Sequence, residues 1–264
     1  MSERITISDL NAMKADGDKF VMVTAYDSTF AKLVSEAGAE CILIGDSLGM
    51  VLQGFDTTVP VSLESMVYHT ACVARARTQS LIVADLPFMS YSSPDVALAA
   101  STELMQQGAQ MVKLEGGIWL SDTIHQLVQR GIPVCAHLGL MPQSVNVYGG
   151  YRVQGRTPKE AKSILADAVE IQDAGASLLL LECIPDHLAA DITAKLDIPV
   201  IGIGAGPDTD AQVLVLHDLL GLTNNPAKFV ENFMVGATSV QDALSRFVQA
   251  VKCGDYPLDK HTYQ

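Results

Sequence analysis

Eight short runs of apolar residues recur along the chain and are separated by longer, more polar stretches. The runs lie at residues 20–24, 41–45, 81–85, 111–115, 133–137, 177–182, 199–204 and 212–217. Several are continuously apolar, as in the four leucines at 178–181. A continuous apolar run of this length is typical of a strand that is buried on both faces. The pattern therefore predicts a parallel sheet of eight strands.

Between most of these runs the apolar positions follow the spacing of an amphipathic helix. Helices are expected at residues 62–76, 94–107, 119–130, 158–174 and 185–196. A glycine follows several of these helices immediately before the next strand, as at Gly108, Gly131 and Gly175. Glycine at that position suits the left-handed backbone that ends many helices. Strands and helices are therefore expected to alternate.

The number of repeated units indicates the fold class. The 264 residues contain no Pro/Ser-rich linker. Eight parallel β/α units fit one (β/α)8 TIM barrel better than an open doubly wound sheet. We expect a single α/β barrel domain over residues 1–264, with a helix at 8–15 as an N-terminal plug. C-terminal helices are expected at 228–233 and 239–251.

Composition and charge limit the partners of such a barrel. The 17 Lys and Arg residues against 30 Asp and Glu residues give a formal net charge of −13, and no basic run occurs. Proteins that bind nucleic acid or an anionic membrane surface usually present a basic patch. Both classes of partner are therefore disfavoured. With 48% apolar and 18% charged residues, the chain is expected to form a compact globular protein.

Targeting signals and a disulfide framework are also not indicated. No apolar run approaches the ~20 residues of a membrane span, and residues 1–5 lack the apolar segment of a secretion signal. The five cysteines are spread along the chain without Cys-x-x-Cys spacing. We therefore expect reduced thiols and a cytoplasmic location.

Polar side chains stand at the ends of five of the predicted strands. They are Asp46 and Ser47 after the second run, Asp85 in the third, Lys113 and Glu115 in the fourth, His137 in the fifth and Glu182 in the sixth. Active sites of parallel barrels lie at the carboxyl ends of the strands, and side chains two residues apart on a strand share a face. Four carboxylates, one lysine and one histidine are therefore expected at one mouth of the barrel.

Carboxylates that converge in a buried site repel one another unless a cation binds among them. Oxygen ligands favour a hard divalent ion, so Mg²⁺ is the expected metal. For each carboxylate taken alone, the alternative is a helix cap or a loop ion pair. Zinc bound by Cys135, His137 and Cys183 is another alternative, and His137 is equally compatible with a structural role.

Lys113 stands between Val112 and Leu114 inside a predicted strand. A buried ammonium group needs a carboxylate partner or an anionic ligand, and we expect both here. A Schiff-base lysine, as in barrel aldolases, is the alternative. Glu115, two residues further on, favours the charged amine.

Two segments carry weaker signals. The glycines of residues 202–206 follow the seventh strand, where many barrels hold phosphate on backbone N–H groups; close backbone packing explains them equally well. The segment 138–157 is rich in Gly, Asn and Tyr. A connection of that length at the active-site end is typically a lid or a substrate wall.

Seven motifs carry a family resemblance that spans nearly the whole chain. They are Thr24-Ala25-Tyr26-Asp27, Gly45-Asp46-Ser47-Leu48-Gly49-Met50, Ala84-Asp85-Leu86-Pro87-Phe88-Met89, Val112-Lys113-Leu114-Glu115-Gly116-Gly117, His137-Leu138-Gly139-Leu140, Pro142-Gln143-Ser144-Val145-Asn146 with Gly149-Gly150-Tyr151, and Gly202-Ile203-Gly204-Ala205-Gly206. On these motifs the sequence resembles the ketopantoate hydroxymethyltransferases (3-methyl-2-oxobutanoate hydroxymethyltransferases) of pantothenate and coenzyme A synthesis. The resemblance implies a barrel similar to those of phosphoenolpyruvate mutase and isocitrate lyase. It also implies Mg²⁺, a 2-oxo acid, 5,10-methylenetetrahydrofolate and a homodecamer.

The same resemblance implies the roles of individual residues. Asp46, Asp85 and Glu115 would hold the metal. Asp46, Ser47, Asp85 and Lys113 would contact the oxo acid, and Glu182 would accept a proton. The chain departs from the family pattern at Met141 and Arg152, where Thr and Lys are expected, and in the stretch 221–229. These departures concern the wall on the folate side.

The chemistry of a 2-oxo acid agrees with these roles. Mg²⁺ bound to its carbonyl and carboxylate would acidify the C3 proton, Glu182 would remove that proton, and the enolate would attack the one-carbon unit of the folate. The main alternative is a Mg²⁺-dependent lyase or mutase that cleaves a bond of a 2-oxo acid, and folate dependence separates the two. An inactive barrel that acts as a binding subunit predicts a broken metal ligand, and none is broken here.

Overall fold

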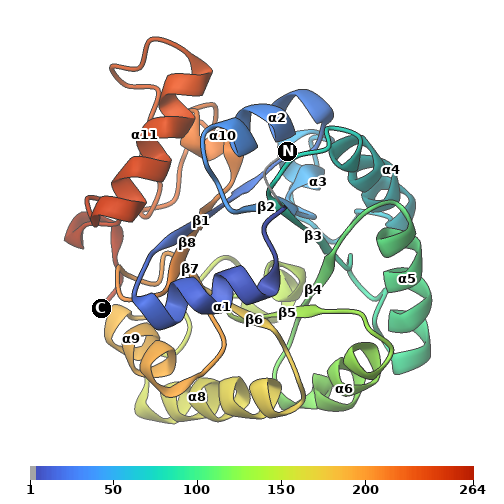
Figure 1. Cartoon of the computed structure of the whole chain (residues 1–264). Helices are drawn as coiled ribbons and strands as arrows, with labels where there is room; N and C mark the ends of the chain where they lie inside the picture. The colour runs from blue at the N-terminus through green and yellow to red at the C-terminus, as the bar shows by residue number, and fades with distance from the viewer. Residues whose placement is uncertain (1–3) are drawn as a thin grey trace.

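The barrel predicted from the apolar runs is present. The structure is a computed structural model that describes residues 4–264; residues 1–3, where the expected domain begins, lie outside the described residues. Eight parallel strands pair in chain order and close on themselves (Figure 1). They are β1 Phe20–Thr24, β2 Cys41–Ile44, β3 Leu81–Asp85, β4 Met111–Glu115, β5 Val134–Gly139, β6 Leu178–Glu182, β7 Val200–Ile203 and β8 Ala211–Leu214. The predicted (β/α)8 fold class is confirmed.

Helices cover the outside of the barrel and close its ends. They are α1 Ile7–Asp16, α2 Ser28–Glu36, α3 Leu48–Val51, α4 Leu63–Ala74, α5 Pro94–Gln106, α6 Ser121–Gln129, α7 Val145–Tyr148, α8 Pro158–Asp173, α9 Asp186–Lys195, α10 Leu216–Leu219 and α11 Val240–Cys253. The five helices expected between strands agree with α4, α5, α6, α8 and α9 within two residues at each end. The apolar pattern did not single out α2, which begins where the side chain of Asp27 accepts the N–H groups of Thr29 and Phe30.

Two expectations near the C-terminal end are wrong. The last strand ends at Leu214 instead of residue 217, because the chain turns into α10 where the Leu216 N–H donates to Thr24 Oγ1 at 2.9 Å. The segment 228–233 is not a helix. Its backbone groups bond to distant elements: Phe229 O accepts from the Tyr256 hydroxyl at 2.6 Å, and Phe233 N–H donates to Leu219 O at 3.0 Å. These long-range bonds replace the bonds that a helix would make within itself.

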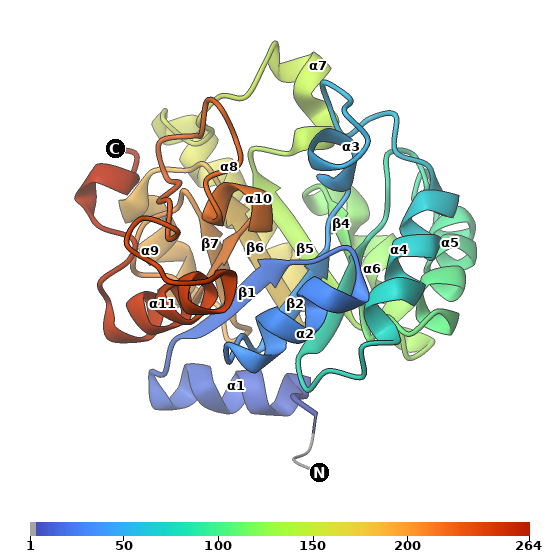
Figure 2. The same cartoon turned by 90° about the horizontal axis from the view of Figure 1, so that it is seen from above.

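The helix α1 lies across the amino-terminal end of the barrel, opposite the end that carries α3 and α7 (Figure 2). Leu10 on this helix is fully buried. Lys14 Nζ lies 2.7 Å from Asp210 Oδ2 and donates to Thr193 O at 3.1 Å. The same Asp210 oxygen accepts from the Val200 N–H at 2.8 Å. These contacts fasten α1 to the start of β7 and β8.

The connection between β7 and β8 has no helix. Residues 204–210 return directly to the start of β8, and this loop itself packs on the outer side of the two strands. A Cβ atom on Gly202 would lie 2.6 Å from Thr209 Oγ1, and Thr209 is fully buried. Gln212 Nε2 donates to Thr209 Oγ1 and to Gly206 O, both at 2.9 Å. Close packing therefore accounts for Gly202.

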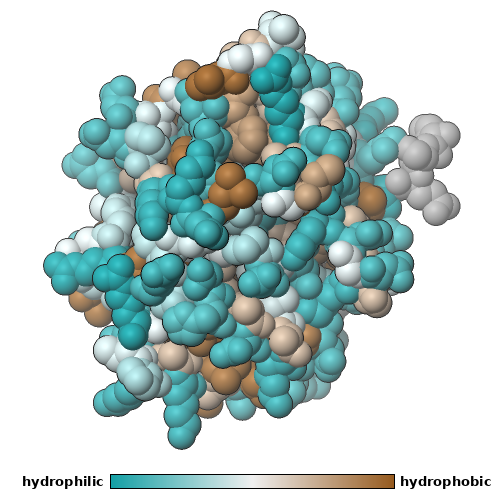
Figure 3. All heavy atoms as spheres, turned by 90° about the vertical axis from the view of Figure 1, so that its left-hand side faces the viewer, coloured by the Kyte–Doolittle hydropathy of each residue, from teal (hydrophilic) through white to brown (hydrophobic). Residues whose placement is uncertain are grey.

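The helix α11 completes the outer layer beside β1 and α2. Its N-cap is Ser239, whose side chain accepts from Asp242 N–H, and its buried face carries Leu244, Phe247 and Val251. Figure 3 looks onto the side with α11 and the C-terminus, where hydrophilic residues cover most of the surface and hydrophobic residues form separate spots. Within residues 4–264, no helix is long and apolar enough to cross a membrane.

Replacing Gly202 with Ala should destabilise the barrel by about 1–3 kcal/mol, because the new methyl group overlaps Thr209 in a packed layer. Urea unfolding of the single variant measures this cost. In the double variant that also carries Thr209→Ala, the methyl group has space, so the two changes should cost less together than the sum of their separate effects. Additive costs would contradict the packing explanation.

Candidate active site

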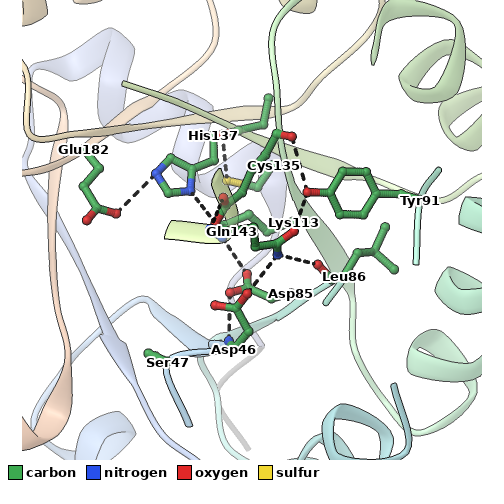
Figure 4. A network of polar contacts seen from close by, with 12 residues as sticks. Asp46, Ser47, Asp85, Leu86, Tyr91, Lys113, Cys135, His137, Gln143 and Glu182 are labelled. Carbon is green, nitrogen blue, oxygen red and sulfur yellow. Dashed lines mark hydrogen bonds and ion pairs between the residues drawn. The ribbon is translucent and has the colours of Figure 1, made fainter. Parts of the chain in front are cut away.

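A cavity of about 940 Å³ opens at the carboxyl end of the barrel. Every site residue expected from the sequence lines it: Asp46, Ser47, Asp85, Lys113, Glu115, His137 and Glu182. They come from the ends of β2 to β6, and Figure 4 shows Asp85 directed toward Lys113 and Glu182 directed toward His137. The structure therefore brings the expected set together, while the role of each residue stays a prediction.

Strand register explains how these side chains meet. Asp85 on β3 is the partner of Lys113 on β4, and Glu115 on β4 is the partner of His137 on β5. Residues two apart on one strand face the same side, so Lys113 and Glu115 both point into the barrel. Leu114, which lies between them, faces the surrounding helices. This alternation of polar and apolar residues fixes which side chains of β4 point into the barrel.

Lys113 and Asp85 form a buried ion pair with 2.8 Å between Nζ and Oδ1. The other oxygen of Asp85 accepts from the Asp46 N–H at 3.0 Å. Burial alone would lower the pKa of Lys113, but the charges of Asp85, Glu115 and Asp46 outweigh it and raise that pKa above its usual value. Lys113 is therefore held as an ammonium ion, which disfavours the Schiff-base alternative.

The carboxylates carry more negative charge than Lys113 neutralises. Burial, followed by the charges of Asp85 and Glu115, raises the pKa of Asp46 well above its usual value. Burial would also raise the pKa of Glu115, but its contact with His137 and the positive charges of His137 and Lys113 lower it. Of these two carboxylates, Asp46 is the one whose charged form an added cation would stabilise more.

His137 lies between two carboxylates. Its Nδ1 is 3.5 Å from Glu115 Oε1, and its Nε2 is 3.3 Å from Glu182 Oε2. Burial and the charge of Lys113 lower the pKa of the imidazole, but its contacts with the carboxylates of Glu115 and Glu182 outweigh them and raise it to about 9. At neutral pH, His137 is therefore an imidazolium that bridges Glu115 and Glu182.

The zinc alternative is not supported. Zinc ligation needs a thiolate, but burial raises the pKa of the Cys135 thiol to about 12 and also raises that of Cys183. Cys135 Sγ instead contacts Ala136 O at 3.7 Å. In the part of the chain that the structure describes, no group of three or more His, Cys, Asp or Glu side chains stands ready to hold a metal ion.

Gln143 is the residue beside the carboxylate cluster that the strand-end pattern missed. Its backbone N–H donates to Glu115 Oε2 at 3.0 Å, and its Nε2 donates to Asp46 Oδ2 at 2.8 Å and to Leu86 O at 2.9 Å. Its Oε1 accepts from the Tyr91 hydroxyl at 2.5 Å. Gln143 lies in the 3-10 turn Pro142–Ser144 and Tyr91 in the loop before α5, so only the family motif around residue 143 pointed to this region. Their hydrogen bonds close the carboxylate cluster (Figure 4).

Ser47 borders the same cavity. Its Oγ is 2.9 Å from the Tyr26 hydroxyl, and a Cβ on Gly45 would lie 2.7 Å from Ser47 Oγ. Glycine at residue 45 therefore leaves room for the Ser47 hydroxyl to turn back over the end of β2.

The segment 138–157 forms part of the cavity wall. It contains the end of β5, a 3-10 turn at Pro142–Ser144 and α7. Leu140, Tyr151 and Arg152 line the cavity, whereas Met141 lines a smaller cavity of about 370 Å³ nearby. Of the departures from the family pattern, Arg152 and the stretch 221–229 therefore border the main cavity.

Two solved structures share this barrel. The 2,3-dimethylmalate lyase of the PEP mutase/isocitrate lyase superfamily matches with a TM-score of 0.59 and 15% identity, over 82% of this chain and 83% of that chain. Phosphonopyruvate hydrolase, solved with oxalate and Mg++, matches with a TM-score of 0.61 and 13% identity, over 79% of this chain and 80% of that chain. The fold is a (β/α)8 barrel of the PEP mutase/isocitrate lyase type.

Sequence comparison defines the family more narrowly. The family model for ketopantoate hydroxymethyltransferase matches residues 4–259. The 3-methyl-2-oxobutanoate hydroxymethyltransferase 2 of Pseudomonas entomophila is 54% identical over 261 residues, which cover 98% of each protein. The chain belongs to the ketopantoate hydroxymethyltransferase family. The expected resemblance is confirmed, and so is the expectation of a hydroxymethyltransferase at the level of the family.

Replacing Gln143 with Leu should lower the free energy of unfolding by about 2–4 kcal/mol, because Asp46 Oδ2 and Leu86 O lose the buried donor that Gln143 supplies and the Tyr91 hydroxyl keeps only its longer contact with Glu115 O. Urea unfolding measures the loss. Gln53→Leu is the matched control, since the Gln53 side chain is exposed and donates only to Ser65; its effect should stay within about 0.5 kcal/mol. Equal losses in both variants would contradict the bridging role.

His137 should make stability depend on pH in protein freed of divalent ions by a chelator. Its folded pKa of about 9 lies above the ordinary value of 6.5, so its contribution is fully present below pH 6.5 and is lost as pH rises through 9. The contribution is on the order of 3 kcal/mol. Urea unfolding of wild type and His137→Gln at about pH 6 and about pH 9.5 should show a loss in wild type that the variant lacks. Parallel losses in both proteins would contradict the assignment.

Proposed function

We propose that the chain transfers a hydroxymethyl group from 5,10-methylenetetrahydrofolate to 3-methyl-2-oxobutanoate and forms ketopantoate. The observation that carries the proposal is the buried arrangement of Lys113, Asp46, Asp85 and Glu115 with Glu182 at its edge, in a chain of this family. A 2-oxo acid offers a carboxylate and an oxo group side by side. The cluster offers a buried ammonium group and carboxylate oxygens that line one cavity.

Lys113 is proposed to bind the oxo acid. Its ammonium group is buried, lines the cavity and is held by Asp85. Together with the Mg²⁺ proposed below, Lys113 would offset the negative charge of the carboxylates, so that an anionic substrate would meet a favourable local field whatever the net charge of the protein. The Ser47 hydroxyl, oriented by Tyr26, is proposed to donate a hydrogen bond to the same substrate.

Asp46, Asp85 and Glu115 are proposed to hold Mg²⁺. These three residues are buried oxygen donors, the kind that Mg²⁺ prefers, and burial together with the charges of Asp85 and Glu115 raises the pKa of Asp46. Since the described side chains are not already grouped as a metal site, binding would require them to turn from their present partners toward the ion. Phosphonopyruvate hydrolase, a structural neighbour, was solved with Mg++, which supports the same metal here. A bound Mg²⁺ would place positive charge beside the oxo group of the substrate and so acidify its C3 proton.

Glu182 is proposed to accept the C3 proton. It lies at the end of β6 on the cavity wall and is less buried than Asp46 or Glu115. His137 orients it through the 3.3 Å contact. Loss of the proton leaves a carbon nucleophile that bonds the one-carbon unit of the donor, and water then supplies the hydroxyl oxygen of ketopantoate as tetrahydrofolate leaves.

The homodecamer implied by the family and the cytoplasmic location indicated by the sequence remain parts of the proposal. Sedimentation of the purified protein tests the assembly. A monomer or dimer at working concentrations would overturn the proposed homodecamer.

One assay tests the proposed reaction. Purified protein is incubated with 3-methyl-2-oxobutanoate, with and without 5,10-methylenetetrahydrofolate and with and without EDTA, and ketopantoate is measured. Product should require the folate and should disappear with EDTA until Mg²⁺ is restored. Cleavage of the oxo acid without folate would instead support a lyase.

Replacing Glu182 with Gln should slow deuterium exchange from solvent into C3 of 3-methyl-2-oxobutanoate by roughly 10² to 10⁴, the usual worth of a positioned general base. This exchange reports proton removal without the folate. Asp186→Asn is the matched control, because Asp186 lies four residues further on, outside the cavity lining. If Glu182→Gln exchanged C3 at the wild-type rate but lost transfer, Glu182 would serve the folate half of the reaction, and His137 would be the next candidate for the base.

A further inference from the structure

The cavity has an outer part that the five-carbon oxo acid does not need. Its volume of about 940 Å³ lies at the upper end of the range of roughly 300–1,000 Å³ that is typical of sites for drug-sized ligands. Four apolar side chains line this cavity and are nevertheless exposed: Met50, Phe55, Tyr151 and Leu222. Large apolar side chains left open at one cavity mouth favour a flat, partly apolar second ligand.

One carboxylate in this wall has no cation partner. Asp218 lies on α10, lines the cavity and accepts a hydrogen bond from the Thr223 hydroxyl. Burial raises its pKa above the usual value, while the Thr223 hydrogen bond opposes that shift. Across residues 4–264, no Lys or Arg forms an ion pair with Asp218. A partly buried carboxylate of this kind is stabilised by N–H donors of a ligand.

A short series of contacts places Asp218 near the site of the oxo acid. The Tyr26 hydroxyl lies 2.9 Å from Ser47 Oγ, and the Tyr26 ring centroid lies 5.8 Å from that of His217, the neighbour of Asp218. Both Asp85 and Asp218 contribute to the raised pKa of Tyr26, after burial. About one tyrosine side chain therefore separates the floor of the cavity from the wall that carries Asp218.

We propose that Asp218 binds the amino-pyrimidinone edge of the pterin ring of the one-carbon donor, an inference that rests on the proposed function. That edge presents a ring N–H and an amino group side by side, and a carboxylate accepts two such donors in parallel. The exposed apolar side chains at the mouth then cover the faces of the ring. Thr223 acts as a positioning residue, because its hydroxyl fixes the carboxylate of Asp218.

Asp218→Asn tests the inference, because asparagine keeps an acceptor for Thr223 but turns an amino group toward the donor groups of the ring. The KM for 5,10-methylenetetrahydrofolate and the Kd for tetrahydrofolate, titrated directly, should each rise about 10- to 100-fold, as expected for a hydrogen bond to a charged group. The KM for 3-methyl-2-oxobutanoate and its C3 exchange without folate should stay within about twofold of wild type. Thermal unfolding checks that the variant is folded.

Two further variants separate a specific contact from a general loss of charge or structure. Asp56→Asn removes another carboxylate that lines the same cavity but is exposed, and it should leave both folate constants unchanged. Thr223→Val should raise the Kd for tetrahydrofolate less than Asp218→Asn does, and Thr223→Ser, which keeps the hydroxyl, should restore it.

The outcomes distinguish this inference from the proposed function. Wild-type folate constants in a folded Asp218→Asn protein, or an equal loss in Asp56→Asn, would overturn the role of Asp218 while folate-dependent transfer still stood. A wild-type protein that bound tetrahydrofolate through Asp218 but formed no ketopantoate would overturn the proposed reaction alone. A wild-type protein that bound no tetrahydrofolate would overturn both.

Discussion

The constraint on which the site depends is the burial of several like charges at one end of a barrel. Asp46, Asp85 and Glu115 lie together with one lysine among them, and such a cluster is costly in a medium of low dielectric constant. Each carboxylate is therefore engaged by a donor: the Lys113 ammonium, a backbone N–H, the Gln143 amide or the His137 imidazolium. The Gln143 hydrogen bond to Asp46 and the protonated His137 both lower the free-energy cost of burying these carboxylates.

Much of the fold and the centre of the site could be predicted from the sequence because both are encoded locally. A strand that is buried on both faces must be continuously apolar, so the run at 178–181 indicates a parallel strand by itself. Polar residues that end such runs must emerge at the carboxyl end of the barrel. That rule alone predicts that Asp46, Lys113 and Glu182 lie at one cavity. The pairing register of neighbouring strands then determines how close the strand ends lie to one another.

The remainder depends on contacts between residues far apart in the sequence. Gln143 looks like any polar loop residue until β2 and β4 bring Asp46 and Glu115 against it. The segment 228–233 has local features that allow a helix, but bonds to Tyr256 and Leu219 determine its path. The short link from β7 to β8 leaves no room for a helix, but only the structure shows that this link packs on Gly202 through Thr209.

The position of His137 has a consequence for how charge is shared in the site. One imidazolium is the counter-ion of two carboxylates, one of them a proposed metal ligand and the other the proposed proton acceptor. If Glu182 accepts a proton as proposed, it no longer attracts the ring, and the positive charge of His137 is then shared with Glu115 alone. The charge state on the substrate side of the cavity would thus reach its charged floor through a single ring.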